Sequence, residues 1–143
     1  FMDVTALHEV SRLQGILDAL SEHIAVINSA GFITQVNAAW RAFAKSNGDP
    51  FLARSGPGVN YLEVCKDIHE PPDAPTAVTA ERRVRAILEG RRKHFTLEYP
   101  CHSPTEERWF VMHVATLPGT QPGAVVSHGN ITQWRNPKSG TSQ

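Results

Sequence analysis

Residues 95–132, FTLEYPCHSPTEERWFVMHVATLPGTQPGAVVSHGNIT, decide the fold of this chain. Three runs at 94–102, 108–117 and 124–132 are rich in β-branched and aromatic residues and alternate apolar with polar positions. The two intervening segments contain prolines and glycines, which interrupt strands. The stretch therefore predicts three consecutive antiparallel strands, and such a sheet must bury at least one face against other elements.

The first part of the chain predicts a helix over residues 3–21. Val10, Leu13, Leu17 and Leu20 are spaced three, four and three residues apart, which is the pattern of a packing seam. Two interpretations stay open. The helix could lie on its own domain, or it could pair with a second copy and carry a signal.

A hairpin and a helix are expected next. The apolar runs 24–28 and 32–37 flank a compact turn that contains glycine, which is typical of a hairpin. Asn37 then stands just before 38–44, where its side chain can cap a helix.

The middle of the chain alternates loops and helices. Residues 46–60 hold several glycines and prolines and are expected to form a long loop. A short helical turn is expected at 61–65, and the prolines of 70–75 argue against regular structure there. The pattern of 76–89 predicts a helix with Gly90 as its C-cap.

Composition narrows the class of protein. The chain has 143 residues, which suits one domain, and 14 basic against 14 acidic residues give a net charge of zero. Nucleic-acid and anionic-membrane surfaces need a basic excess, so contact with either is not expected. Cys65 and Cys101 predict free thiols, as in cytoplasmic proteins. Because the chain starts at Phe1, we expect it to be part of a longer protein; residues 136–143 suggest a flexible tail or tag.

Four motifs resemble the bacterial PAS sensor family: GVNYLEVC at 58–65, FTLEYPCHSP at 95–104, RWFVM at 108–112 and SHGNIT at 127–132. The resemblance covers about residues 20–135. It implies an α+β fold with a five-stranded antiparallel sheet in the order 2-1-5-4-3 and helices over one face. An amphipathic helix at 1–20 would flank the other face, before a PAS domain at 21–135.

The resemblance also implies a function. PAS domains of this kind are sensory modules of bacterial signalling proteins, with an output domain such as a histidine kinase or a cyclic-dinucleotide enzyme elsewhere in the parent chain. Many end in Asp-Ile-Thr, where this chain has Asn130-Ile131-Thr132. The flavin-binding branch has Cys directly after an Asn, but Tyr61 follows Asn60 here, so no flavin adduct is expected.

The turn lengths predict a register for the last three strands. They pair Tyr99 with Phe110, Leu97 with Met112 and Phe95 with Val114, and they bring His128 beside Met112 and Val126 beside Val114. In a PAS fold this row would face the helices and enclose a ligand pocket. The residues expected to form that pocket are Trp40, Phe43, Tyr61, Leu62, Ile87, Phe95, Leu97, Tyr99, Phe110, Met112, Val126 and His128.

The opposite face of the sheet is also apolar. It would carry Trp109, Val111, His113, Val125 and Ile131, so the N-terminal helix or a second subunit is expected to cover it. The residues expected in helix packing or a dimer are Val10, Leu13, Leu17, Leu20, Trp109 and Val111. Trp134 is expected to pack where the chain leaves the sheet.

Three functions stay open from the sequence. The first is a sensor that binds a small, mostly apolar ligand, the second a ligand-free dimerisation module, and the third a haem sensor that uses His128 or His69. An inward His128 needs a hydrogen-bond partner, and that partner could be a neighbour or a ligand. Haem is the least expected cofactor and no metal site is expected. No catalytic motif is present, so this segment is not expected to be an enzyme.

Overall fold

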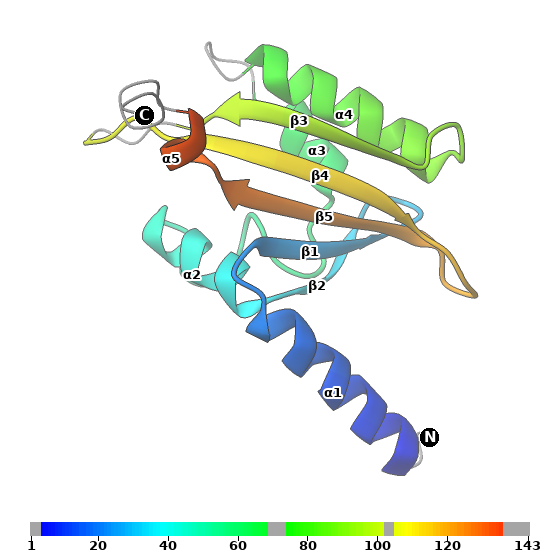
Figure 1. The fold of residues 1–143 in the computed structure, drawn as a ribbon. Coiled ribbons are helices and arrows are strands. Elements are labelled where there is room, and N and C mark those ends of the chain that lie inside the picture. The colour runs from blue at the N-terminus through cyan, green and yellow to red at the C-terminus, as the bar shows by residue number, and fades with distance from the viewer. Residues whose placement is uncertain (1–3, 69–73, 102–104, 136–143) are drawn as a thin grey trace.

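A five-stranded antiparallel sheet dominates the computed structural model, which describes residues 4–68, 74–101 and 105–135 (Figure 1). The strands lie in the order β2-β1-β5-β4-β3, which confirms the predicted topology. Their bounds are β1 His23–Asn28, β2 Ile33–Val36, β3 His94–Pro100, β4 Trp109–Leu117 and β5 Gly123–Asn130. The predicted meander is therefore β3, β4 and β5.

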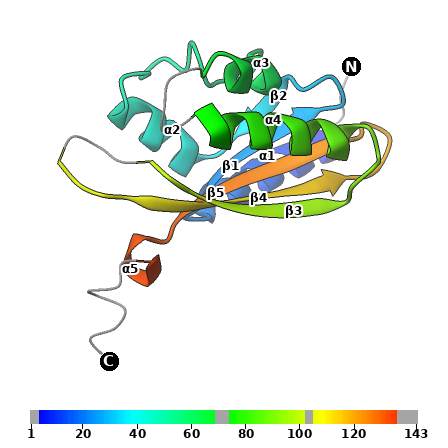
Figure 2. The ribbon, with the colours of Figure 1, turned by 90° about the horizontal axis from the view of Figure 1, so that it is seen from above.

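The described residues also form five helices. They are α1 Val4–Ala19, α2 Ala38–Ser46, α3 Tyr61–Lys66, α4 Ala74–Leu88 and α5 Thr132–Arg135. Figure 2 shows α2, α3 and α4 on one side of the sheet and α5 on the other. Helix α4 begins two residues earlier than the sequence predicts. Pro75 is compatible with this start, because the first helical turn needs no backbone N–H donor.

The predicted register is confirmed. Tyr99 pairs with Phe110 and Leu97 with Met112, and His128 lies opposite Met112 in the next pair of strands. Because side chains alternate between the two faces, this register places the predicted inward row on the helix side. Phe110 and Met112 are buried to 2% exposure.

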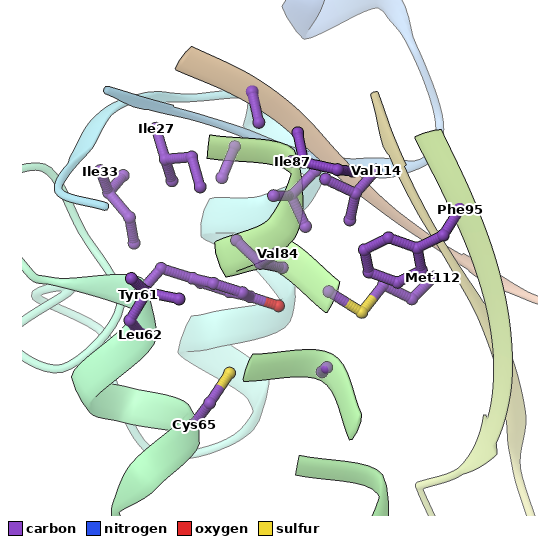
Figure 3. Close-up of a cluster of buried hydrophobic side chains, with 14 of the residues drawn as sticks. Ile27, Ile33, Tyr61, Leu62, Cys65, Val84, Ile87, Phe95, Met112 and Val114 are labelled. Atoms are coloured by element: carbon purple, nitrogen blue, oxygen red, sulfur yellow. The ribbon is translucent and has the colours of Figure 1, made fainter. Parts of the chain in front are cut away.

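The core fills the space between the sheet and the helices. Figure 3 shows Tyr61 and Cys65 from α3, Val84 and Ile87 from α4, and side chains from four strands converging there. The core residues are Ala25, Ile27, Ile33, Val36, Tyr61, Leu62, Cys65, Ala80, Val84, Ile87, Phe95, Met112, Val114, Ala124 and Val126.

Asn37 joins three elements at one end of the sheet. Its Oδ1 accepts hydrogen bonds from the backbone N–H of Trp40 at 3.0 Å and of Ile24 at 2.9 Å. Its Nδ2 donates to the backbone oxygens of Leu17 at 2.8 Å and Glu22 at 2.9 Å. The side chain therefore caps α2, as predicted, and also ties the end of α1 to the domain.

Helix α1 has a different position from the one expected. It runs away from the sheet beyond β2 and does not cross β3, β4 or β5 (Figure 1). Gln14 donates to the Val36 carbonyl at 3.1 Å, and Asp18 accepts from the Ala38 backbone N–H at 2.8 Å. These polar contacts hold α1 beside β2 and α2. The face with Val111 is consequently not covered by α1.

The chain leaves the sheet through α5. Trp134 is 76% exposed, so the prediction that it packs where the chain leaves the sheet is wrong. Helix α5 is held instead by the backbone N–H of Trp109, which donates a hydrogen bond to the Thr132 hydroxyl at 3.0 Å. Asn130 Oδ1 accepts from the Thr132 backbone N–H at 3.0 Å and from its hydroxyl at 2.6 Å. The uncharged side chain of Asn130 thus links the end of β5 to the start of α5.

Candidate ligand-binding site

A cavity of about 260 Å³ opens between α2 and the inner face of the sheet. We call it the α2 cavity. Strand residues form one wall and residues of α2 and the following loop form the other. Its lining residues are His23, Trp40, Phe43, Ala44, Asn47, Asp49, Ser55, Tyr99, Phe110 and His128.

Aromatic rings make most of the wall of the α2 cavity. The Phe43 ring lies 4.5 Å from the His23 ring and 5.5 Å from the Phe110 ring, measured between centroids. Tyr99 lies 5.9 Å from Phe110, nearly parallel to it. The guanidinium carbon of Arg108 lies 5.6 Å above the Phe43 ring. Such a surface favours a flat, apolar molecule.

The polar groups on the loop side hold the loop in place. The indole Nε1 of Trp40 donates to the Ser55 carbonyl at 2.8 Å. Asp49 accepts from the Ser55 hydroxyl at 2.7 Å and from the backbone N–H groups of Ala53 and Arg54. The hydrogen bond from Ser55, followed by those from the two backbone groups, lowers the pKa of Asp49, so this carboxyl is ionised at neutral pH.

His128 sits between two tyrosines. The Tyr99 hydroxyl oxygen lies 2.6 Å from Nδ1 of His128, and the Tyr61 hydroxyl oxygen lies 3.2 Å from Nε2. Both ring nitrogens therefore have a partner inside the protein. We call these three residues the Tyr–His–Tyr chain. Its members come from α3, β3 and β5, which lie far apart in the sequence.

His128 and Tyr61 are uncharged at neutral pH. Burial, with a smaller contribution from nearby His23, lowers the pKa of His128 to about 4. Burial also raises the pKa of Tyr61 well above its usual range and lowers the pKa of His23. Neutral His and Tyr side chains offer hydrogen bonds but no charge, so they suit an uncharged polar group.

A second cavity of about 210 Å³ lies between α3, α4 and the sheet. We call it the α4 cavity. It shares Tyr99 and His128 with the α2 cavity, and Figure 3 shows Tyr61 extending from α3 toward the strands. Its lining residues are Tyr61, Cys65, Ile68, Thr76, Ala77, Ala80, Tyr99, Pro100, Cys101, Met112 and His128.

The predicted pocket residues fall into three groups. Trp40, Phe43, Tyr99, Phe110 and His128 line the α2 cavity. Tyr61 and Met112 line the α4 cavity, together with Tyr99 and His128. Leu62, Ile87, Phe95, Leu97 and Val126 belong to the packed core or lie against it and line neither cavity.

Several lining residues carry no signal in the sequence that marks them as part of a cavity. His23 is the first residue of β1 and lies opposite His128 in the register between β1 and β5, which the turn lengths do not reveal. Asp49 and Ser55 belong to the loop after α2, where no periodic pattern marks which side chains face inward.

The residues expected in helix packing are exposed or half-buried. Val10, Leu13 and Leu20 are 52%, 54% and 45% exposed, and Leu17 is half-buried. Trp109 and Val111 are half-buried on the uncovered face of the sheet. The single chain therefore leaves an apolar stripe along α1.

The described part of the chain holds no group of three or more His, Cys, Asp or Glu side chains arranged for a metal ion. Iron binding by His128 would cost one of its two tyrosine contacts, and His69 lies outside the described residues. None of the described helices is long and apolar enough to cross a membrane.

The family model for the PAS fold matches residues 17–133, which include the whole sheet and both cavities. The chain belongs to the PAS family. As a PAS domain it resembles, in its fold, a sensor region of a sensor histidine kinase, with a TM-score of 0.57 and 15% identity over 80% of this chain and 41% of that one. It also resembles the phage VqmA–DPO complex, with a TM-score of 0.62 and 14% identity over 94% of this chain and 58% of that one.

One relative is similar in sequence as well. The uncharacterized 104.1 kDa protein in the hypE 3′ region of Rhodobacter capsulatus is 48% identical over 137 residues. These residues are 95% of this chain but 14% of that protein. The PAS domain therefore corresponds to a small part of this relative.

Proposed function

We propose that this PAS domain is the sensory module of a bacterial signalling protein and binds a small, uncharged, mostly apolar ligand in the α2 cavity. The observation that carries the proposal is the combination of aromatic walls with the neutral Tyr–His–Tyr chain. A cavity of about 260 Å³ suits a molecule of one or two rings with a single polar group. The lining includes the ionised Asp49 and neither lysine nor arginine, so a ligand carboxylate is disfavoured there.

The ligand would act by favouring one of two packings of α2 on the sheet. Asn37 connects the start of α2 to the end of α1, so a shift of α2 would reach α1. We propose that α1 pairs with a second copy through its apolar stripe and passes the change to an output domain. The fold likeness to a histidine kinase sensor region and the length of the Rhodobacter relative support such a parent protein.

The proposed role is regulatory, and we assign no enzymatic activity to this segment. A cytoplasmic location fits two free cysteines in the described chain. A ligand-free dimerisation module is the second candidate, and the exposed stripe of α1 favours it. A haem sensor is the weaker alternative, because His128 already uses both ring nitrogens.

Native mass spectrometry of the purified chain and thermal shifts across a panel of small aromatic metabolites test the proposal. We expect a retained molecule or an uncharged panel member that raises the melting temperature, while its carboxylated analogue does not. No retained mass and no thermal shift across the panel would contradict ligand binding and favour the dimerisation module. A Soret band after incubation with haem, lost in His128→Asn, would favour the haem sensor.

A further inference from the structure

His23 differs from the other polar side chains that line the α2 cavity. Each of the others makes at least one hydrogen bond to the protein; they are Trp40, Asn47, Asp49, Ser55, Tyr99 and His128. The imidazole of His23 contacts aromatic rings and has no hydrogen bond within residues 4–68, 74–101 and 105–135. The described residues contain no fully buried side-chain nitrogen that lacks a partner, so the ring nitrogens of His23 are accessible to a bound molecule.

The ring of His23 is held in a defined position. Its centroid lies 4.5 Å from that of the Phe43 ring on α2. The backbone on either side is anchored by Asn37, which accepts from the Ile24 N–H at 2.9 Å and donates to the Glu22 carbonyl at 2.9 Å. A ligand in the α2 cavity would therefore meet an imidazole that needs little rearrangement to bind it.

The two histidines that line the α2 cavity are not equivalent for a ligand. Both ring nitrogens of His128 lie within hydrogen-bond distance of a tyrosine hydroxyl, whereas those of His23, its partner in the pairing of β1 with β5, do not. A ligand at His128 would have to replace an existing hydrogen bond, but a ligand at His23 would not. Burial lowers the pKa of His23, so its imidazole is uncharged at neutral pH and offers one donor and one acceptor.

We propose that His23 recognises the polar group of the ligand and that this group is a hydroxyl on an aromatic ring. The ring of the ligand would lie against the aromatic wall of the α2 cavity, and its hydroxyl would bond to a nitrogen of His23. A hydroxyl suits either nitrogen of a neutral imidazole, because it both donates and accepts. This contact rests on the proposed function, because it assumes that a ligand occupies the α2 cavity.

Calorimetric titration of the full chain with 2-naphthol and with naphthalene tests this contact, because the two molecules differ only in the hydroxyl. We expect the native chain to bind 2-naphthol about threefold to tenfold more tightly, which is the effect of one net hydrogen bond. His23→Phe keeps a flat ring and removes both nitrogens, so it should bind the two molecules about equally. His113, an exposed histidine on the other face of the sheet, supplies the control: His113→Phe should keep the native preference.

Equal affinity of the native chain for the two molecules, or a preference for 2-naphthol that is unchanged in His23→Phe, would overturn the proposal. If His23→Phe does not fold, ¹⁵N-labelled histidines in the native chain give a second measurement. The ring nitrogen signals of His23 should move more with 2-naphthol than with naphthalene, and equal changes would overturn the contact. A native chain that binds neither molecule also overturns it, whereas the thermal shifts across the wider panel still decide whether any ligand binds.

Discussion

At the scale of single residues, His128 is the polar centre of the inner face. The sequence places it correctly in the inward row, because alternation and turn length fix its register. Its two partners could not be predicted, since Tyr61 lies on another element 67 positions away. His23 was missed for a related reason: the pairing of β1 with β5 joins the two ends of the domain.

The lowered pKa of His128 predicts a pH dependence of stability. Its pKa is about 4 in the folded chain and about 6.5 when unfolded, so the unfolded chain binds an extra proton between these values. Stability from this residue is complete above pH 6.5 and falls as the pH drops toward 4. Between pH 7.5 and pH 5 the free energy of unfolding should fall by about 2 kcal/mol more in the native chain than in His128→Asn.

Urea denaturation of both proteins at the two pH values measures this difference. His23 also has a lowered pKa and titrates in the same direction, but it is present in both proteins and cancels in the comparison. An equal loss of stability in the two proteins would mean that His128 is solvated in the folded chain.

At the scale of elements, the strands and most helices follow from periodicity and capping residues. Asn37 and Asn60 cap α2 and α3, and the few residues that separate β3, β4 and β5 in the sequence leave these strands little freedom to pair otherwise. The position of α1 could not be predicted from periodicity and capping residues. Its apolar stripe suggests a surface to cover, but Gln14 and Asp18 hold it beside β2 and α2.

Replacing glycine with alanine should change the stability in opposite directions at two positions. A Cβ at Gly123 would overlap with the carbonyl of Ile27 on the neighbouring strand, whereas a Cβ at Gly15 on α1 meets open space. Gly123→Ala should cost about 1–3 kcal/mol of unfolding free energy. Gly15→Ala should add about 0.5–1 kcal/mol, because alanine favours a helix.

Denaturation curves of the two variants beside the native chain give both values. If Gly123→Ala leaves the free energy of unfolding unchanged, β5 can move away from β1 at its first residue. A destabilising Gly15→Ala would show that α1 is not helical there in the isolated chain.

At the scale of the whole molecule, α1 and the uncovered face of the sheet are the candidate surfaces for a partner. The family and the strand order were predictable because four motifs spread over the chain agree on one fold. The division of the interior into two cavities was not predictable, because it depends on which side chains fill the core. Phe95 and Ile87 pack closely, for example, while Phe43 and Phe110 border open space.

If α1 pairs with a second copy through its apolar stripe, the protein should be a dimer. A single charged residue on that stripe should then disrupt the dimer. Leu13→Lys places a cation on the apolar stripe, whereas Ser11→Lys adds the same charge at an exposed polar position of the same helix. Sedimentation should show a dimer for the native chain and for Ser11→Lys, and a monomer for Leu13→Lys. A monomer in all three, or a dimer in all three, would argue against pairing through this stripe.

Ligand binding in the α2 cavity is tested most directly by filling it. Ala44 lines the cavity and is buried, while Ala42 lies two residues away on the exposed side of α2. Calorimetric titration should use the panel molecule with the largest thermal shift on the native chain, Ala44→Phe and Ala42→Phe. We expect affinity to fall at least tenfold in Ala44→Phe and to stay unchanged in Ala42→Phe; equal affinity in all three proteins would contradict a ligand site in this cavity.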